Sequence, residues 1–269
     1  MTKKSLVVVT GSLDAPGAVL LHDAAQASGL NASLVLIDSP QVIDEINGAD
    51  YVLYRVSPRT HSLFTALDEH LNDGARRSLR AVLNAFDKEV TNEFLVAHAI
   101  PTPHTYSIGR EDAIDEYPKV VKILNGNQGI GVRLINNEEE LRAYRDEFQD
   151  EAQFIVQEYI EESKGSDARL FVIGDKVCGA MRRVSQSDDF RANLHLGGRM
   201  EPYEPSELEC DYAVRAVKAL GLQYAGVDII QSHRGPLVLE VNSSPGFGVQ
   251  AVTSIDLPLA VIAELIGAS

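Results

Sequence analysis

Two carboxylates and a carboxamide, Asp228, Glu240 and Asn242, lie close together late in the sequence. The apolar runs 227–230 and 236–241 flank a short polar turn, which predicts an antiparallel hairpin. Folding the hairpin about residues 232–235 places Asp228 opposite Glu240 within about one residue, and Asn242 shares a strand face with Glu240. Opposed carboxylates among apolar neighbours repel each other, and a divalent cation relieves that repulsion. Three hard oxygen ligands favour Mg²⁺ or Mn²⁺, whereas a solvent-facing polar side of the hairpin is the alternative.

A glycine-rich segment is the second chemical feature. Gly126, Gly129 and Gly131 fall within six residues, so backbone amides there can approach an anion closely. The segment is not a Walker A loop, because no Lys-Ser or Lys-Thr follows and strand signals come next. Lys122 precedes it on a predicted strand, from which its ammonium can reach phosphate oxygens. A simple glycine-rich hairpin turn would explain the same pattern.

Cations form the third feature, because they stand out in an acidic half of the chain. They are Lys88, Arg182, Arg183 and Arg191. Each alone is typical of a surface charge or an ion pair. The loop 190–198 is more specific, since it combines Arg191, Asn193, His195 and two glycines. Binding groups concentrate in such loops.

The composition excludes several classes of protein. Of the 269 residues, 45% are hydrophobic and 23% are charged, which is an ordinary globular balance. No apolar run approaches the roughly 20 residues of a membrane helix, and no signal peptide is recognisable, so we expect a cytoplasmic protein that does not bind membranes. Two cysteines exclude a disulfide framework and a four-thiolate zinc site.

The net charge of −15 argues against nucleic-acid binding, because an acidic surface repels phosphates. The charge is uneven along the chain. The first 86 residues carry 7 basic and 9 acidic side chains, and the remainder carries 17 and 30. Any ATP site must therefore be built from a few inward-pointing cations.

The elements that position these residues change character along the chain. Up to residue 60, short apolar strands alternate with a helix at 15–28, which predicts a small parallel sheet. Residues 61–98 are predicted to be helical. Beyond Pro103, strands, hairpins and three helices predict an α+β body. Besides the hairpin at 227–241, the expected strands are 119–124, 132–135, 154–159, 168–173 and 177–182, and the expected helices are 138–148, 208–220 and 257–266.

From Lys88 onward, these motifs in this order resemble the ATP-grasp superfamily and, within it, the RimK-like carboxylate–amine ligases. The motifs are residues 121–122, 126–132, 156–160, 167–169, 189–198, 225–228 and 234–246. The resemblance implies an α/β N-terminal domain and an α+β ATP-grasp fold that holds ATP between two subdomains. The expected divisions are a small α/β domain at 1–86, a lid subdomain at 87–158 and a metal-bearing subdomain at 159–269.

The resemblance also implies roles for individual residues. Lys88 and Lys122 would contact ATP phosphates under the loop of Gly126, Gly129 and Gly131. Glu158 and Tyr159 would bind adenine, and Asp167 would lie near the ribose. Arg191 and Asn193 would lie beside the γ-phosphate and the acyl intermediate as catalytic residues. The cofactor set would be ATP with two Mg²⁺ or Mn²⁺ ions held by Asp228, Glu240 and Asn242.

The implied activity is ATP-dependent amide-bond formation through an acyl phosphate. L-Glutamate or another amino acid would be added to a peptide or protein C-terminus or to a small acid, and the resemblance implies a homo-oligomer. Arg55, Arg59, His195 and Ser243 are the candidate substrate-binding residues. Leu196 stands where glutamate ligases of this kind often carry a basic residue, so the amino acid stays open. A small-molecule kinase and a non-catalytic ATP-binding module are the alternatives.

Overall fold

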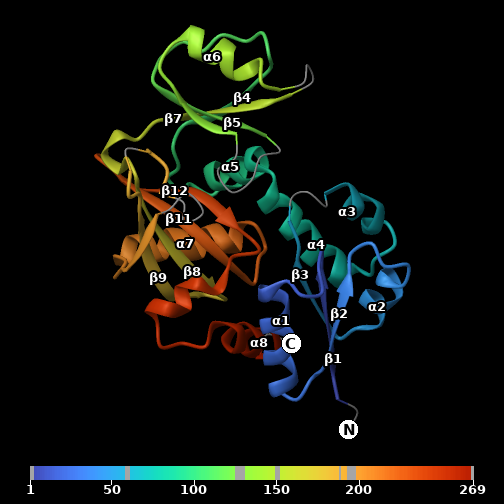
Figure 1. The fold of residues 1–269 in the computed structure, drawn as a ribbon. Coiled ribbons are helices and arrows are strands. Elements are labelled where there is room, and N and C mark those ends of the chain that lie inside the picture. The colour runs from blue at the N-terminus through green and yellow to red at the C-terminus, as the bar shows by residue number, and fades with distance from the viewer. Residues whose placement is uncertain are drawn as a thin grey trace.

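Three β-sheets with helices around them make up the molecule (Figure 1). The computed structural model describes residues 3–57, 61–124, 131–148, 152–187, 189–192 and 198–267, without the side chains of residues 61, 62 and 65. Among the described residues, none of the helices combines the length and the hydropathy that crossing a bilayer requires.

The N-terminal sheet is parallel, with the strand order β2-β1-β3. Its strands and the helices that connect them are β1 (Ser5–Thr10), α1 (Pro16–Ala27), β2 (Asn31–Leu36), α2 (Val42–Gly48) and β3 (Tyr51–Arg55). Because strand side chains alternate, Leu6 and Val8 pack in the cluster that contains α1, whereas Val7 and Val9 pack in the cluster that contains α2. This alternation gives the sheet two buried faces, as βαβ connections require.

Three helices lead from this sheet into the centre of the molecule: α3 (His61–Asp68), α4 (Asp73–Phe86) and α5 (Lys88–Ala97). The side chain of Asn72 caps α4 by accepting from the backbone N–H of Ala75. Asp87 caps α5 by accepting from the N–H groups of Glu89 and Val90. This cap fixes the start of α5 and places Lys88 in its first turn.

The middle sheet is antiparallel, with the order β4-β7-β5-β6. Its elements are β4 (Thr105–Ile108), β5 (Lys119–Ile123), β6 (Val132–Ile135), α6 (Glu138–Arg145) and β7 (Phe154–Glu158). Val121, Phe154 and Val156 face α6 and pack on its Leu141 and Tyr144. The residues between them in the strands point to the opposite face, which is the face turned toward the rest of the molecule (Figure 1).

The largest sheet is antiparallel and has the order β10-β9-β8-β11-β12. Its elements are β8 (Ser166–Ile173), β9 (Lys176–Val184), β10 (Arg199–Pro202), α7 (Glu207–Ala219), β11 (Tyr224–Ser232) and β12 (Gly235–Asn242). Helix α7 covers one face through a core that includes Leu170, Val227 and Val217. A capping box between Ser206 and Glu209 fixes the start of α7.

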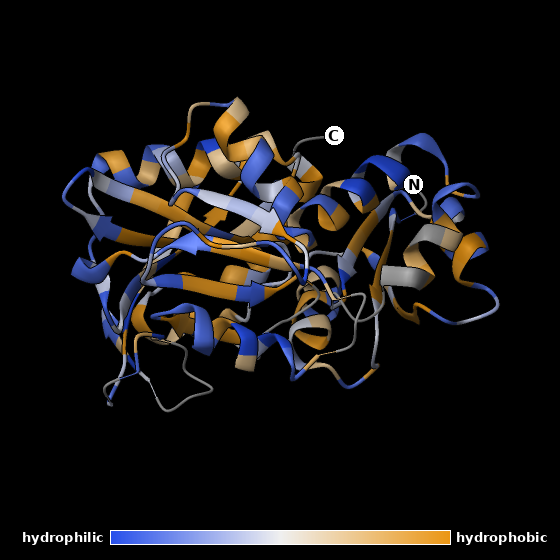
Figure 2. Ribbon diagram, turned by 90° about the horizontal axis from the view of Figure 1, so that it is seen from above, coloured by the Kyte–Doolittle hydropathy of each residue, from blue (hydrophilic) through white to orange (hydrophobic). Residues whose placement is uncertain are grey.

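Helix α8 (Leu257–Gly267), at the C-terminal end of the chain, packs against the N-terminal part of the molecule. It lies beside α1, and one core cluster contains Leu21 of α1, Ile262 of α8 and Phe171 of β8. Figure 2 shows that hydrophobic residues concentrate in the strands and on the helix surfaces that face them. The N-terminal sheet therefore shares a core with the large sheet that includes residues of α1 and α8, whereas the middle sheet has a core of its own (Figure 1).

Candidate functional site

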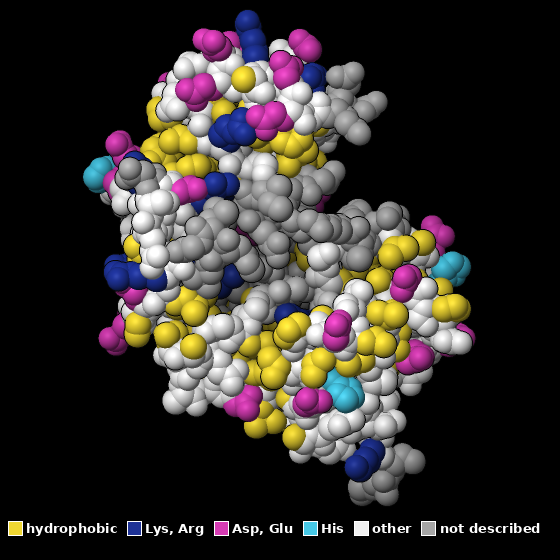
Figure 3. All heavy atoms as spheres, viewed as in Figure 1, with side chains coloured by type: hydrophobic (Ala, Val, Ile, Leu, Met, Phe, Trp, Pro, Cys, Tyr) yellow, Lys and Arg dark blue, Asp and Glu magenta, His cyan; other side chains and the backbone are white. Residues whose placement is uncertain are grey.

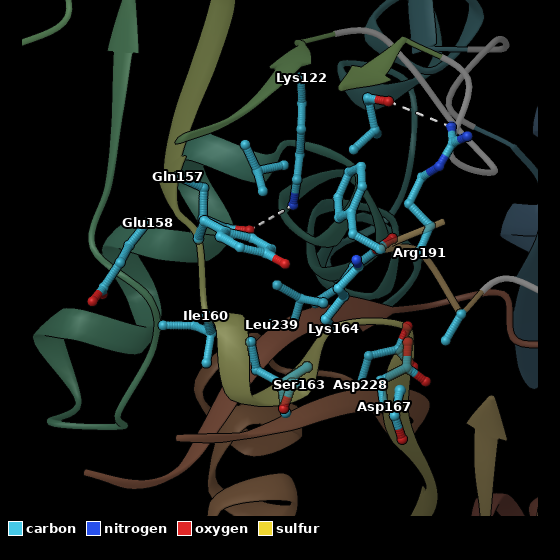
Figure 4. Close-up of a pocket in the computed structure, with 18 of the residues that line it drawn as sticks. Lys122, Gln157, Glu158, Ile160, Ser163, Lys164, Asp167, Arg191, Asp228 and Leu239 are labelled. Atoms are coloured by element: carbon cyan, nitrogen blue, oxygen red, sulfur yellow. Dashed lines mark hydrogen bonds between the residues drawn. The ribbon is translucent and has the colours of Figure 1, made fainter. Parts of the chain in front are cut away.

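A cleft of about 950 Å³ lies between the middle and large sheets. Strands β5 and β7 line it from one side, and strands β8, β11 and β12 line it from the other (Figure 4). The first turn of α5 reaches one end. In the space-filling view, the surface is hollowed between the part that carries α6 and the part that carries α3 (Figure 3). A cleft between two sheets that is lined by both charged and apolar side chains suits a small-molecule ligand.

Two lysines enter this cleft from different elements. The Nζ of Lys122 on β5 donates to Oε1 of Gln157 on β7 at 2.8 Å (Figure 4). Burial lowers the pKa of Lys122 to about 8, a shift that the Glu240 charge opposes and the Lys88 charge increases. The Nζ of Lys88 donates to the carbonyl oxygen of Leu124 at 3.3 Å, and burial also lowers its pKa. Two desolvated cations in one cleft are well suited to binding phosphate groups.

A buried ion network forms the floor of the cleft. Arg169 on β8 donates from Nε and Nη2 to the two carboxylate oxygens of Asp228, at 2.6 and 2.7 Å. Arg183 on β9 bridges two carboxylates, donating to Asp228 at 2.6 Å and to Asp167 at 2.6 and 2.7 Å. These contacts follow from the ladders, which place Arg169 opposite Asp228 and Arg183 opposite Asp167.

Burial and the neighbouring charges shift the pKa values of Asp228, Asp167 and Arg183. Burial alone would raise the pKa of Asp228, but Arg169 and Arg183 outweigh it and lower that pKa to about 2. Burial raises the pKa of Asp167 despite Arg183. Burial opposes the charge of Arg183, yet the two carboxylates hold its pKa above the ordinary value. Asp228 is therefore a carboxylate at any physiological pH.

The β11–β12 hairpin has the register that the sequence predicts. Asp228 is the Cα partner of Glu240, and Ser232 is the partner of Gly235 at the turn. The Glu240 carboxylate is exposed to the cleft. The Oδ1 of Asn242 accepts from the backbone N–H of Ser244 at 2.9 Å.

These three side chains fit a magnesium ion by their donor chemistry. A carboxylate has four lone-pair positions, and Asp228 uses one on Oδ1 and two on Oδ2 for its arginine partners. One lone-pair position on Oδ1 of Asp228 therefore remains for a metal ion. The oxygens of Glu240 and Asn242 would supply the other protein ligands. Among the described residues, no cluster of three or more His, Cys, Asp or Glu side chains offers a competing site of zinc type.

Arg191 connects the two sides of the cleft. Its guanidinium pairs with Asp189 at 2.7 Å, which lowers the pKa of that carboxyl, and its Nη1 donates to the carbonyl oxygen of Val132 on β6 at 3.4 Å (Figure 4). Asn193 and His195, which the sequence places next to it, lie outside the described residues, as do Arg59, Gly126 and Gly129. Gly131 is described, and its φ of +69° beside Ile123 requires a glycine.

The linker after β7 closes one end of the cleft. Tyr159 and Glu158 both line the cleft, but the Glu158 side chain points away from it (Figure 4). Its carboxylate accepts from Arg234 at 2.6 Å and from the backbone N–H of His104 at 3.2 Å. Burial alone would raise the Glu158 pKa, but Arg234 and the His104 N–H outweigh it and lower that pKa. The Glu158 carboxylate is therefore held by Arg234 and His104 outside the cavity, and its backbone N–H donates to the carbonyl oxygen of His104 at 2.8 Å.

The two expected substrate residues that the structure describes, Arg55 and Ser243, lie apart from this cleft. Arg55 ends β3, and its Nη1 donates to the carbonyl oxygen of Pro245 at 2.9 Å while its guanidinium lies 5.3 Å from the Phe247 ring centre. Ser243 is buried and lines a separate cavity of about 360 Å³ with Tyr224. The structure therefore does not bring Ser243 into the cleft.

Sequence reasoning missed several residues that the cleft uses. Gln157, Arg169 and Arg234 form its hydrogen bonds and ion pairs. Gln157 alone has a sequence signal, since it alternates with buried Val156 on β7. The role of Arg169 depends on strand order. The role of Arg234 depends on how the β11–β12 turn lies against the end of β7 in the middle sheet. The sequence reveals neither.

Comparison with known proteins fits this geometry. The family model of the RimK-like ATP-grasp domain matches residues 85–265. The chain belongs to the RimK-like ATP-grasp family. Among curated proteins, "Probable alpha-L-glutamate ligase" of Xanthomonas axonopodis pv. citri (strain 306) is 40% identical over 232 residues, which cover 82% of this chain and 79% of that protein.

Solved structures confirm the ATP-grasp fold. The RimK domain ATP-grasp protein of Sphaerobacter thermophilus DSM 20745 aligns with a TM-score of 0.72 at 21% identity, covering 98% of this chain and 100% of that one. The ATP-grasp ligase PsnB, solved with a phosphomimetic variant of its minimal precursor, Mg and ADP, aligns with a TM-score of 0.70 at 21% identity, covering 99% of each chain.

Proposed function

We propose that this RimK-like ATP-grasp protein joins an amino acid, with L-glutamate favoured, to the carboxylate of a peptide, a protein C-terminus or a small acid. The chain is an ATP-dependent carboxylate–amine ligase. Its relatives that carry the name of alpha-L-glutamate ligase support glutamate as the amino acid. The observation that carries the proposal is the meeting of Lys88, Lys122 and Glu240 at one end of the cleft.

This arrangement gives ATP a direction in the cleft. Ile160, Ile230 and Leu239 form an apolar cluster at the linker end, where the adenine would pack beside the linker backbone and Tyr159. The lysines at the other end would bind the phosphates. Asp167 lies on the floor between these ends, where its carboxylate would face the ribose.

The reaction needs an activated carboxylate, because a carboxylate ion is a poor electrophile. An oxygen of the acceptor carboxylate attacks the γ-phosphorus, the bond to the bridging oxygen breaks, and ADP leaves. An amine then attacks the acyl phosphate, and phosphate departs. Lys88 and Lys122 would stabilise the charge on ADP, and Arg191 would stabilise the oxyanion of the tetrahedral intermediate. Asn193 is proposed to assist Arg191.

A divalent ion would complete the phosphate site. Two Mg²⁺ or Mn²⁺ ions, held by Asp228, Glu240 and Asn242, would neutralise the β- and γ-phosphates. Glu240→Ala removes the exposed carboxylate of this set, so we expect ADP release to fall below detection in a coupled assay. Release near the wild-type rate would contradict the metal assignment.

The test of the function is product analysis. The protein is incubated with ATP and Mg²⁺ and a panel of twenty amino acids and short acidic peptides, and ADP and phosphate are measured. Mass spectrometry follows each reaction with turnover. A product heavier by one residue, with one ADP and one phosphate per bond, supports the ligase and names the amino acid. A phosphorylated product without free phosphate would instead indicate a kinase.

A further inference from the structure

A small cavity of about 360 Å³ lies where the N-terminal sheet meets the large sheet, apart from the nucleotide cleft. Strand β3 and helix α4 line it from the N-terminal part (Figure 1), and the turn between α7 and β11 lines it from the other part, together with Tyr224 and Ser243. Apolar side chains such as Leu53 and Val82 form much of the wall. In the described structure no charged side chain lines this cavity. A group bound inside must therefore be uncharged, because nothing here would compensate a buried charge.

Two hydroxyl groups in the wall of this cavity have unmet hydrogen bonds. The side-chain oxygens of Tyr224 and Ser243 are buried and have no partner in the described structure, and the two residues are only 5% and 3% exposed. The Tyr224 ring stacks on Phe171, with 6.2 Å between the ring centres, which holds the hydroxyl in place. The hydroxyl of Tyr54 in the same wall differs, since it donates to the carbonyl oxygen of Ala75 at 3.2 Å. Unmet buried hydroxyls are costly, so we expect a partner inside the cavity.

Water fits these groups by size and by hydrogen-bonding capacity. The cavity has room for about three water-sized groups, and exposed Gly221 and Gln223 in its wall allow exchange with solvent. A water molecule both donates and accepts, so it satisfies a hydroxyl in either orientation. Backbone groups of β3 can supply further bonds. Because β3 is an edge strand, the sheet leaves one row of its N–H and C=O groups unused.

Ser243 connects the cavity to the proposed metal site, because it directly follows Asn242 in the chain. The chain beyond it is tied to β3, since the Ser244 hydroxyl donates to the carbonyl oxygen of Tyr54 at 3.5 Å. A partner for the Ser243 hydroxyl would fix the chain immediately beside Asn242 as well. That position of the chain determines where the Asn242 side chain offers its oxygen to a metal ion.

We propose that ordered water in this cavity links the hydroxyls of Tyr224 and Ser243 and thereby holds Asn242 in position to bind a metal ion. Tyr224 and Ser243 are then positioning residues, which touch neither the nucleotide nor the metal. The part of the proposal that concerns Asn242 rests on the proposed ligase function, in which this residue is a metal ligand. The water site itself does not depend on that function.

Urea unfolding of the metal-free protein tests the water site. Tyr224→Phe and Ser243→Ala each remove one hydroxyl with little change of shape. If water links the hydroxyls, the urea midpoint should fall in each variant, and the second substitution should cost less in the double variant than alone. Tyr54→Phe removes a hydroxyl that has a direct protein partner, so it gives the size of an ordinary loss. A midpoint that rises in Tyr224→Phe, as removal of an unmet buried hydroxyl predicts, or strictly additive effects would overturn the proposal.

A high-resolution crystal structure and magnesium titration test the two parts of the proposal separately. We expect electron density for water within hydrogen-bond distance of both hydroxyls in the wild type. Calorimetric titration of Mg²⁺ in the presence of ADP should give a Kd that is about tenfold higher in Tyr224→Phe and unchanged in Tyr54→Phe. A cavity without ordered water would contradict the water site, and an unchanged Kd in Tyr224→Phe would contradict the positioning of Asn242. Absence of ADP release with every substrate would instead contradict the ligase function, since none of these measurements requires turnover.

Discussion

Arg183 balances the charge beneath the cleft, because it is buried and bonded to both Asp167 and Asp228. Arg183→Met would leave two buried carboxylates with fewer partners, at a cost of about 3–5 kcal/mol in the free energy of unfolding. Urea denaturation at pH 7 measures this loss. Arg182→Met is the matched control, since Arg182 is exposed and stacks 4.9 Å from the Tyr203 ring centre. Equal losses in the two variants would contradict the role of Arg183.

The charge on Lys122 should set an alkaline limit to activity. With a pKa lowered to about 8, the Lys122 ammonium in the free enzyme loses its proton as the pH rises through 8. We expect kcat/KM for ATP to fall toward a tenfold loss per pH unit above that value, because kcat/KM reports ionisation of the free enzyme. Lys122→Arg stays charged throughout this range, so its activity, even if lower, should show no such decline up to pH 10. A decline of the same shape in both proteins would assign it to another group.

At the scale of elements, Gly17 in the first turn of α1 determines where Arg55 lies. A Cβ at this position would overlap Nη2 of Arg55, so the Arg55 guanidinium would have to move. Gly17→Ala should therefore displace Arg55 from the carbonyl oxygen of Pro245. If Arg55 binds the amino acid, the amino-acid KM should rise severalfold in Gly17→Ala, as in Arg55→Leu.

The KM for ATP distinguishes a specific loss of amino-acid binding from a general disturbance of the site. Lys88 and Lys122, which we propose to bind the phosphates, lie away from Gly17 and should be unaffected. Gly11→Ala is the control, because a Cβ there meets nothing within 4 Å. Parallel increases in the ATP and amino-acid KM values of Gly17→Ala would argue against substrate binding by Arg55.

Elements with a strong local pattern were predictable from the sequence, and two short edge strands without an apolar run were not. The turn aligns Ser232 with Gly235, which by itself would place Asp228 opposite Leu239. A register shift between Asp228 and Ile229 places Asp228 opposite Glu240 instead, so the hairpin pattern predicts this pairing to within one residue. Strand β10 was missed because Arg199–Pro202 is mostly polar and pairs with β9 alone. Strand β4 is a four-residue edge strand that likewise lacks an apolar run. A short strand without an apolar run, such as β4 or β10, takes its structure from the neighbouring strand, which the local sequence does not encode.

The difference between local and long-range contacts also explains which residues of the site the sequence does not reveal. Asp228 and Glu240 lie in one hairpin, but the arginine partners of Asp228 come from β8 and β9. Arg169 meets Asp228 only because β8 pairs with β11. Arg182 and Arg183 look equivalent in the sequence. Because side chains alternate along β9, Arg183 is buried and Arg182 is exposed.

At the scale of the whole molecule, the middle sheet and the large sheet form the two sides of one cleft. Lys122 and Gln157 belong to the first sheet, and Asp228 and Glu240 belong to the second. Few polar links join these sides in the described structure. Among them are the bond from Arg191 to Val132 and the ion pair between Arg234 and Glu158. A bound nucleotide would add contacts to both sides at once, so it should stabilise one arrangement of the two sheets.

We propose that residues 87–158 act as the lid of the ATP site and that nucleotide holds this lid closed. Limited proteolysis tests the closure, with cleavage positions assigned by mass spectrometry. ATP with Mg²⁺ should slow cleavage within residues 119–157 several-fold, because a closed segment must open before a protease can act. Cleavage outside this range, in the N-terminal sheet, provides the internal control. Lys122→Ala should lose the protection if phosphate binding causes closure, whereas equal cleavage with and without nucleotide in the wild type would show that the cleft does not close.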